Sequence, residues 1–185
     1  MTSTITAEQV ALPTGTWNID ASHSTADFTV RHAMISKVRG RFEGVSGRVE
    51  VVDDLTAARV VAEIDMASIR TGDESRDTHL RSADFFDVEQ FPTMTFTSRE
   101  IRPAGQDWVV VGDLNLHGVT RPVELAVEFN GVIKDPFGAT RAGFSATTEI
   151  NRKDFGLTWD AVLETGGVGV SDTVNVALEI QAAKV

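Results

Sequence analysis

The residues of this chain best suited to acid–base or metal chemistry are its four histidines, His23, His32, His79 and His117. No two of them have the His-x-His or HExxH spacing that holds a metal ion. His117 precedes Gly118 and is expected in a surface turn. His23 and His32 flank one strand pattern, which would place both at one mouth of a barrel. A structural, hydrogen-bonded role is the simpler interpretation for both.

A second candidate is the pair Asp77 and His79, which lie close enough in sequence to suggest an acid–base couple. On a helix, however, residues i and i+2 point apart, so the pair cannot share a substrate. We therefore predict that they cap the helix and form ion pairs with Arg76 or Arg81. The alternative is that His79 points into a cavity.

Other catalytic signatures are missing from the sequence. There is no cysteine, no GxSxG nucleophile elbow and no glycine-rich phosphate loop with its lysine. The glycine cluster at 166–169 does not lead from a strand into a helix. It belongs to a long segment, residues 151–172, that carries Phe155 and Trp159, and long aromatic loops are typical of binding segments.

Composition limits the partners of the protein. A formal net charge of -10 and a pI near 4.8 oppose broad contact with nucleic acid or anionic membranes, although a local basic pocket is compatible with them. Met1 to Pro13 lacks a secretory signal, and no apolar run is long enough to cross a bilayer. We expect a cytoplasmic protein that requires no cofactor. Residues 1–14 are predicted to be a flexible arm and residues 15–185 a single domain.

Most of the chain shows the two-residue period of half-buried strands. In the clearest case, Val123, Leu125, Val127 and Phe129 alternate with more polar residues. About eight such segments joined by short turns predict an all-β fold, an eight-stranded antiparallel barrel, with a two-sheet sandwich as the alternative. The one helical signal is Thr71–Asp87, which we expect to close or flank one end of the barrel. Whether the aromatic residues fill the barrel or line a cavity is left open by the periodicity.

Seven sequence motifs occur in order between Gly15 and the C-terminus, and together they carry a family resemblance. They are Trp17-x-Ile19-Asp20-x-x-His23-Ser24, Phe28-x-Val30-x-His32, Val38-x-Gly40-x-Phe42, Arg76-Asp77-x-His79-Leu80-x-Ser82-x-Asp84-Phe85-Phe86-Asp87, Phe91-Pro92-x-Met94-x-Phe96, Leu114-x-Leu116-x-Gly118-Val119-Thr120 and Asn151-Arg152-x-Asp154-Phe155-Gly156. The chain resembles the YceI-like family, described as polyisoprenoid-binding or lipid-binding proteins.

This resemblance implies a lipocalin-like barrel around a hydrophobic tunnel that holds a long-chain amphiphile such as a polyisoprenoid, an isoprenoid quinone or a fatty acid. The resemblance also implies that several relatives carry export signals, a pattern that Met1 to Pro13 does not show. The residues expected to surround the tail are Phe28, Val30, Phe42, Phe85, Phe86, Phe96, Leu116, Phe129, Phe144 and Trp159. The residues expected around the polar head are His23, Ser24, Arg31, His32, Asp77, His79, Asn151 and Arg152.

Two rival functions follow from the same residues. The first is a barrel enzyme, such as an isomerase or cyclase, in which His79 or His32 would be needed for turnover but not for binding. The second is a filled barrel that serves as an interaction domain. Val109 and Val111 indicate a homodimer surface, although scattered exposed apolar residues are normal.

Overall fold

The computed structural model describes residues 12–161, 163, 167 and 169–185. Most of the predicted arm, residues 1–11, lies outside the described residues, as does much of the glycine cluster at 166–169. Leu12 is buried in the core, so the packed part of the chain begins before Gly15. No helix in the described ranges is both long and apolar enough to cross a membrane.

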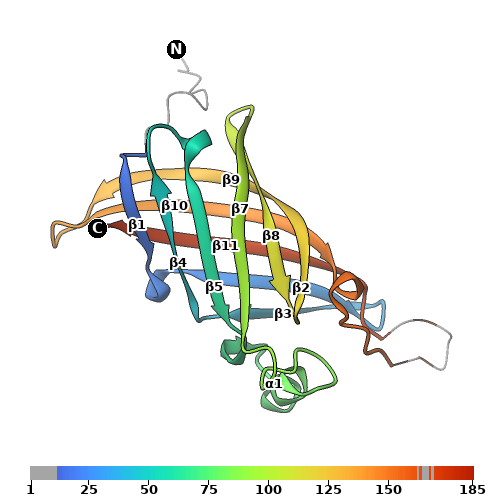
Figure 1. The fold of residues 1–185 in the computed structure, drawn as a ribbon. Coiled ribbons are helices and arrows are strands. Elements are labelled where there is room, and N and C mark those ends of the chain that lie inside the picture. Colours follow the sequence, from blue (N-terminus) through green and yellow to red (C-terminus); the bar gives the residue numbers. More distant parts are fainter. Residues whose placement is uncertain (1–11, 162, 164–166, 168) are drawn as a thin grey trace.

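The described chain consists of strands, one α-helix and four 3₁₀ turns (Figure 1). The strands are β1 (Gly15–Ile19), β2 (Thr25–His32), β3 (Ser36–Phe42), β4 (Val45–Val51), β5 (Arg59–Asp65), β6 (Ile69–Arg70), β7 (Thr93–Ala104), β8 (Asp107–Leu116), β9 (Val119–Lys134), β10 (Thr140–Asn151) and β11 (Thr173–Lys184). The helix is α1 (Glu74–Arg81), and the 3₁₀ turns are η2 (Ala21–His23), η3 (Leu55–Ala57), η4 (Met66–Ser68) and η5 (Arg152–Phe155).

The strands close into the predicted eight-stranded antiparallel barrel. Its ring runs β1-β4-β5-β7-β8-β9-β10-β11 and returns to β1. β11 also pairs with β2, because β1 and β2 run in the same direction along it with η2 between them. The following stretch changes partner in the same way. β3 pairs with β2, and after the non-strand residues Glu43 and Gly44 the chain continues as β4, which pairs with β1. This closure excludes the two-sheet sandwich.

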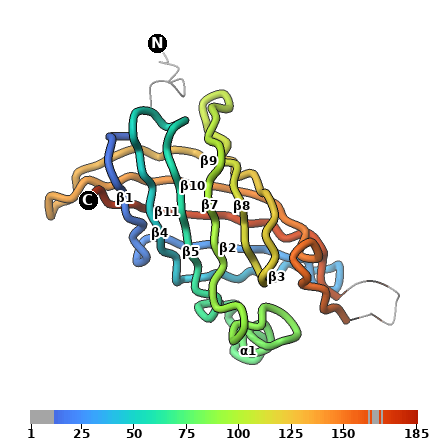
Figure 2. The backbone as a smooth tube through the Cα atoms, viewed as in Figure 1, coloured from blue at the N-terminus to red at the C-terminus, as the bar shows by residue number. Residues whose placement is uncertain are grey.

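The single helix lies where the sequence predicted it. Asp73 caps α1, accepting a hydrogen bond from the backbone N–H of Arg76 at 2.9 Å. Ser82 ends the helix, and its hydroxyl donates to the carbonyl of His79 at 2.6 Å. Figure 2 shows that α1 covers the barrel below β5 and β7, away from the C-terminus, which lies beside β1.

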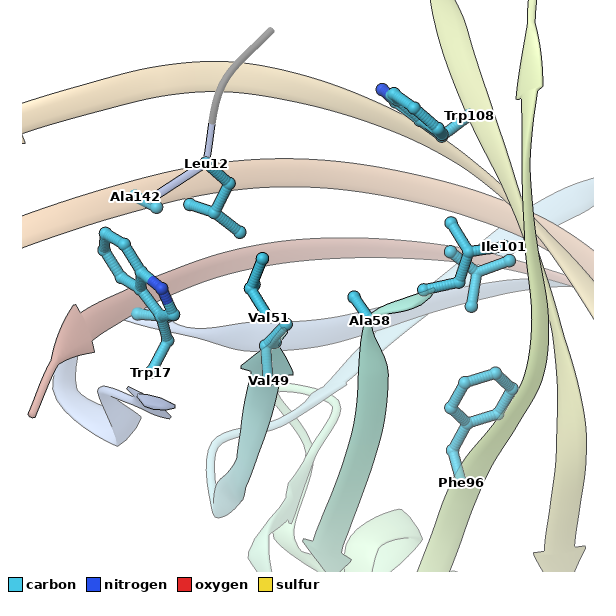
Figure 3. Packing of buried hydrophobic residues seen from close by; sticks show 11 residues of the cluster. Leu12, Trp17, Val49, Val51, Ala58, Phe96, Ile101, Trp108 and Ala142 are labelled. Atoms are coloured by element: carbon cyan, nitrogen blue, oxygen red, sulfur yellow. The ribbon is translucent and has the colours of Figure 1, made fainter. Parts of the chain in front are cut away.

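The barrel interior contains two hydrophobic clusters, which define two ends of the molecule. The arm end is built around Leu12, Trp17 and Trp108, with Val49, Val51 and Ala58 beside them (Figure 3). The helix end is formed by α1 and by the described parts of the chain after β10, residues 152–161 and 169–172. Leu80 of α1 packs there against a buried cluster that contains Phe42, Met66 and Phe155. Val109 and Val111, the predicted dimer surface, are half-buried within the single chain.

Candidate ligand-binding site

A cavity of about 300 Å³ lies inside the barrel and extends from one hydrophobic cluster to the other. Leu12, Val49 and Trp108 line it at the arm end, and Leu80 and Leu157 line it at the helix end. All but three of its 39 lining residues are apolar, the exceptions being Asp27, Thr148 and Arg152. The barrel is therefore hollow, and the filled-barrel interpretation is wrong.

The cavity wall follows directly from the strand period. Along β9, Leu125, Val127 and Phe129 face inward, and Ala126 and Glu128 between them are exposed. The inward residues are nevertheless only half-buried, because they border empty space rather than other side chains. A volume of about 300 Å³ is at the lower end of the range typical of small-molecule sites.

Two glycines shape this wall. A Cβ atom added to Gly40 would come within 2.3 Å of the Phe28 ring, and one added to Gly112 within 2.4 Å of the Phe96 ring. Each aromatic ring therefore lies over the bare backbone of the neighbouring strand. Any larger residue at these glycines would push the rings into the cavity.

Arg152 organises the backbone at the helix end. Its buried guanidinium donates hydrogen bonds to four backbone carbonyl groups. The acceptors and distances are Ser171 at 3.0 Å, Leu157 at 2.7 Å, Trp159 at 2.8 Å and Val170 at 3.2 Å. One cation thus holds together two stretches of chain that form no strand with each other, and each of these charge-assisted bonds is stronger than a neutral one.

Asp160 holds the same segment from its other side. Its Oδ1 accepts from the backbone N–H groups of Ala161 at 2.8 Å, Gly169 at 2.9 Å and Val170 at 3.2 Å. Burial acts to raise the pKa of this carboxyl group, but the backbone donors and Arg152 outweigh burial and lower the pKa. Asp160 is therefore an anion in the folded protein.

Aromatic side chains join α1 to this segment. The His79 ring lies 5.2 Å from Phe85 and 5.0 Å from Trp159, and Phe85 lies 5.0 Å from Trp159, measured between ring centroids. The Nε2 atom of His79 is 2.9 Å from a carboxylate oxygen of Asp84. Phe85 also lines the cavity, so this cluster separates the cavity from solvent at the helix end.

The YceI-like domain profile matches residues 17–182 of this sequence. The chain belongs to the YceI-like family. It is 38% identical over 154 residues to the UPF0312 protein SAS2572 of Staphylococcus aureus, covering 82% of this chain and 88% of that protein.

Solved structures of YceI-like barrels have the same fold. The crystal structure of the Campylobacter jejuni YCEI protein has a TM-score of 0.70 and 30% identity, covering 84% of this chain and 90% of that one. Burkholderia cenocepacia BcnA has a TM-score of 0.74 at 24% identity, over 88% of this chain and 98% of BcnA. A polyisoprenoid binding domain from Saccharophagus degradans, implicated in plant cell wall breakdown, has a TM-score of 0.69 at 20% identity, over 91% and 98%.

In this YceI-like barrel, nine of the ten residues predicted to surround a tail lie on the cavity wall. They are Phe28, Val30, Phe42, Phe85, Phe86, Phe96, Leu116, Phe129 and Phe144. Trp159 is not among the wall residues, because its loop folds back onto Arg152 and its ring packs against α1.

The residues predicted around a polar head do not form one cluster. His23 lies just before β2 and His32 is its last residue, and the eight residues of β2 span roughly 26 Å at about 3.3 Å per residue, so the two histidines do not share a mouth. His23 instead hydrogen-bonds Asp20 at 2.9 Å. The buried Ser24 hydroxyl donates to the carbonyl of Gln181 and accepts from its N–H.

Three more of the predicted head residues are occupied by backbone partners. Asp77 is buried and accepts from the N–H and hydroxyl of Thr71, at 2.9 and 2.5 Å, in place of the predicted ion pair with Arg76 or Arg81. Asn151 caps η5, accepting from the N–H of Lys153 at 3.0 Å. Arg152 is the third, bonded to carbonyl groups as described above.

Of the predicted head residues, Arg31, His32, His79 and Asn151 lie near the helix end and are at least partly exposed, and Asn151 is the one of these that caps η5. His117, expected at the surface, is half-buried in the β8–β9 turn, where its Nδ1 lies 3.1 Å from the carbonyl oxygen of Phe155. Within the described ranges, no three His, Cys, Asp or Glu side chains gather as a metal site would require.

Sequence reasoning missed several wall residues at the arm end, among them Leu12, Val49, Ile101 and Trp108. Three of them, Val49, Ile101 and Trp108, lie on strands. Assigning every second residue of each strand to the barrel interior would have found them. Leu12 lies in a stretch without period, and no sequence signal identifies it.

Proposed function

We propose that this YceI-like protein binds and carries a long-chain amphiphile, a polyisoprenoid, an isoprenoid quinone or a fatty acid, with the tail inside the barrel. The observation that carries the proposal is the cavity between the two hydrophobic clusters, lined by apolar residues at all but three positions. The Saccharophagus degradans relative, described as a polyisoprenoid binding domain, has the same fold and agrees with this ligand class.

Burial of the tail supplies the affinity. Each methylene moved from water into an apolar site contributes about 0.8 kcal/mol, so a dozen carbons contribute roughly 10 kcal/mol before the costs of association are subtracted. One extra methylene changes this little, which gives broad tolerance of chain length. The protein would therefore select its ligand mainly by the head group.

The head would lie at the helix end, outside the apolar lumen. Imidazole and aromatic contacts would come there from His79 with its Asp84 partner, from the Trp159 ring and from the exposed His32. A quinone, amide or hydroxyl head needs no more than such partners. Because Arg152 already bonds four carbonyl groups, it is not free to form a fork with a phosphate.

Titration with a fluorescent polyene fatty acid tests the proposal. Trp108 lines the cavity, so a bound polyene should quench tryptophan emission and itself emit by energy transfer. Ala62→Phe, which adds a ring inside the cavity, should weaken binding at least tenfold. Val61→Phe, on the exposed face of the same strand, is the matched control and should bind like the wild type. Absence of transfer in the wild type, or equal losses in both variants, would contradict the proposal.

A further inference from the structure

The β2–β3 hairpin, whose turn is Ala33-Met34-Ile35, displays large apolar side chains on an exposed, strained turn. Met34 is 61% exposed and Ile35 is 86% exposed. Ala33 and Met34 have φ values of 49° and 62°, a left-handed conformation that disfavours residues with a side chain. Backbone strain and exposed apolar side chains do not stabilise the fold, so their combination in one turn indicates an interaction site.

The hairpin is also basic in an acidic protein. Residues 28–42 contain four Lys or Arg residues and no Asp or Glu, while the whole chain has a net charge of -10. Arg31 faces Lys37 directly across the strand pair, and like charges at opposed positions repel. Arg41 pairs with Asp27 at 3.0 Å, but no ion pair within the described residues involves Arg31, Lys37 or Arg39.

The hairpin is held firmly at the helix end of the cavity. The Ala33 N–H donates to the carbonyl of Gly169 at 2.8 Å, and the Ser171 N–H donates to the carbonyl of Arg31 at 3.0 Å. Val30 on the hairpin and Val170 on the facing segment both line the cavity. Figure 1 shows the turn between β2 and β3 at the same end of the barrel as the chain that follows β10.

We propose that this hairpin docks the protein on an anionic phospholipid membrane, with Met34 and Ile35 inserted among the acyl chains and Arg31, Lys37 and Arg39 at the phosphates. An exposed apolar turn with a basic base fits a membrane surface, which receives side chains without a preformed pocket. The acidic remainder of the protein would be repelled, so only this end would face the lipid. The inference goes beyond ligand binding, because it concerns the membrane surface at which the cavity would take up or release its ligand.

Co-sedimentation with vesicles tests the proposal. The wild type should bind vesicles of mixed phosphatidylglycerol and phosphatidylcholine, bind pure phosphatidylcholine far more weakly, and be released by high salt. Replacing Arg31, Lys37 and Arg39 by Gln should lower the partition coefficient by on the order of 100-fold, about fivefold for each charge. The double variant Met34→Asp, Ile35→Asp should lower it at least tenfold.

Matched controls lie elsewhere on the same chain. Arg48→Gln, Arg59→Gln and Lys134→Gln change the net charge equally at exposed sites, and Phe137→Asp removes a 95% exposed ring from the β9–β10 turn. These controls should bind vesicles like the wild type. All variants should keep the wild-type circular dichroism, and those that retain Arg31 should also keep the wild-type polyene binding. No preference for anionic vesicles, or equal losses in the controls, would overturn the proposal. So would hairpin variants that change the sedimentation coefficient without vesicles, which would make the turn a contact between copies.

Discussion

The two ends of this barrel are built by different means. At the arm end, strands and turns converge on Leu12, Trp17 and Trp108, and apolar packing closes the structure. At the helix end, α1 and the described residues 152–161 and 169–172 form none of the named strands, and charged side chains bonded to backbone groups hold them in place. The arm end should therefore be the more stable of the two, whereas the helix end should open locally at a lower free-energy cost.

Arg152→Met offers the most severe test of this difference. The change removes a buried cation and leaves four carbonyl groups, one buried and three partly buried, without their donor, so we expect a loss in the free energy of unfolding of about 3 kcal/mol or more. Urea denaturation measures the loss, and hydrogen exchange should quicken at the N–H groups of residues 169–171 but not in β4. Arg121→Met, which removes a single exposed bond to the carbonyl of Asp154, should cost under about 1 kcal/mol. Equal losses in the two variants would contradict the role given to Arg152.

Leu12→Ala probes the arm end in the same way. Removing a buried leucine costs about 2 to 5 kcal/mol, and the lower part of that range is expected because the side chain already borders a cavity. The loss should appear in urea denaturation while hydrogen exchange in residues 169–171 keeps its wild-type pattern. Faster exchange there would mean that the two ends are not independent.

Asp20 gives the arm end a dependence on pH. Its pKa lies well below the usual range because the Ser22 hydroxyl, His23 and Arg141 all bond the carboxylate. A lowered folded-state pKa contributes stability above the unfolded pKa, about 3.9, and that stability is lost as the pH falls further. Asp20→Asn should cost about 1 kcal/mol at pH 7 and progressively less below pH 4. A difference that is equal at pH 7 and pH 3 in urea denaturation would contradict this account.

The smallest effect is expected at the hairpin turn. Ala33→Gly relieves a left-handed residue but loosens the unfolded chain, for a net gain of about 0.5 kcal/mol. Ala104→Gly, at the end of β7 where φ is not positive, should instead cost about 0.5 to 1 kcal/mol. Thermal denaturation compares the two, and opposite signs are the expected result.

The barrel was predictable because it depends on local alternation, and this two-residue period turns Phe96, Leu116 and Phe129 inward, although only the family resemblance indicated that they line a cavity. The surroundings of the residues expected around the polar head were not predictable in this way. Ser24 and Arg152 are types that bind ligands, yet their partners are the backbone groups of Gln181 and Val170, at 157 and 18 positions along the chain. Nothing in the local pattern shows that a polar side chain is already occupied. Leu12 escaped notice for the opposite reason, since only the closed barrel gives it a place to pack.

Native mass spectrometry of the freshly purified protein beside Ala62→Phe tests the hollow barrel most directly. The account predicts that the wild type carries an added mass, that organic solvent releases it as a long-chain lipid, and that Ala62→Phe carries much less while Val61→Phe carries as much. A wild type that remains at its bare mass after incubation with isoprenoid quinones and fatty acids would contradict the account.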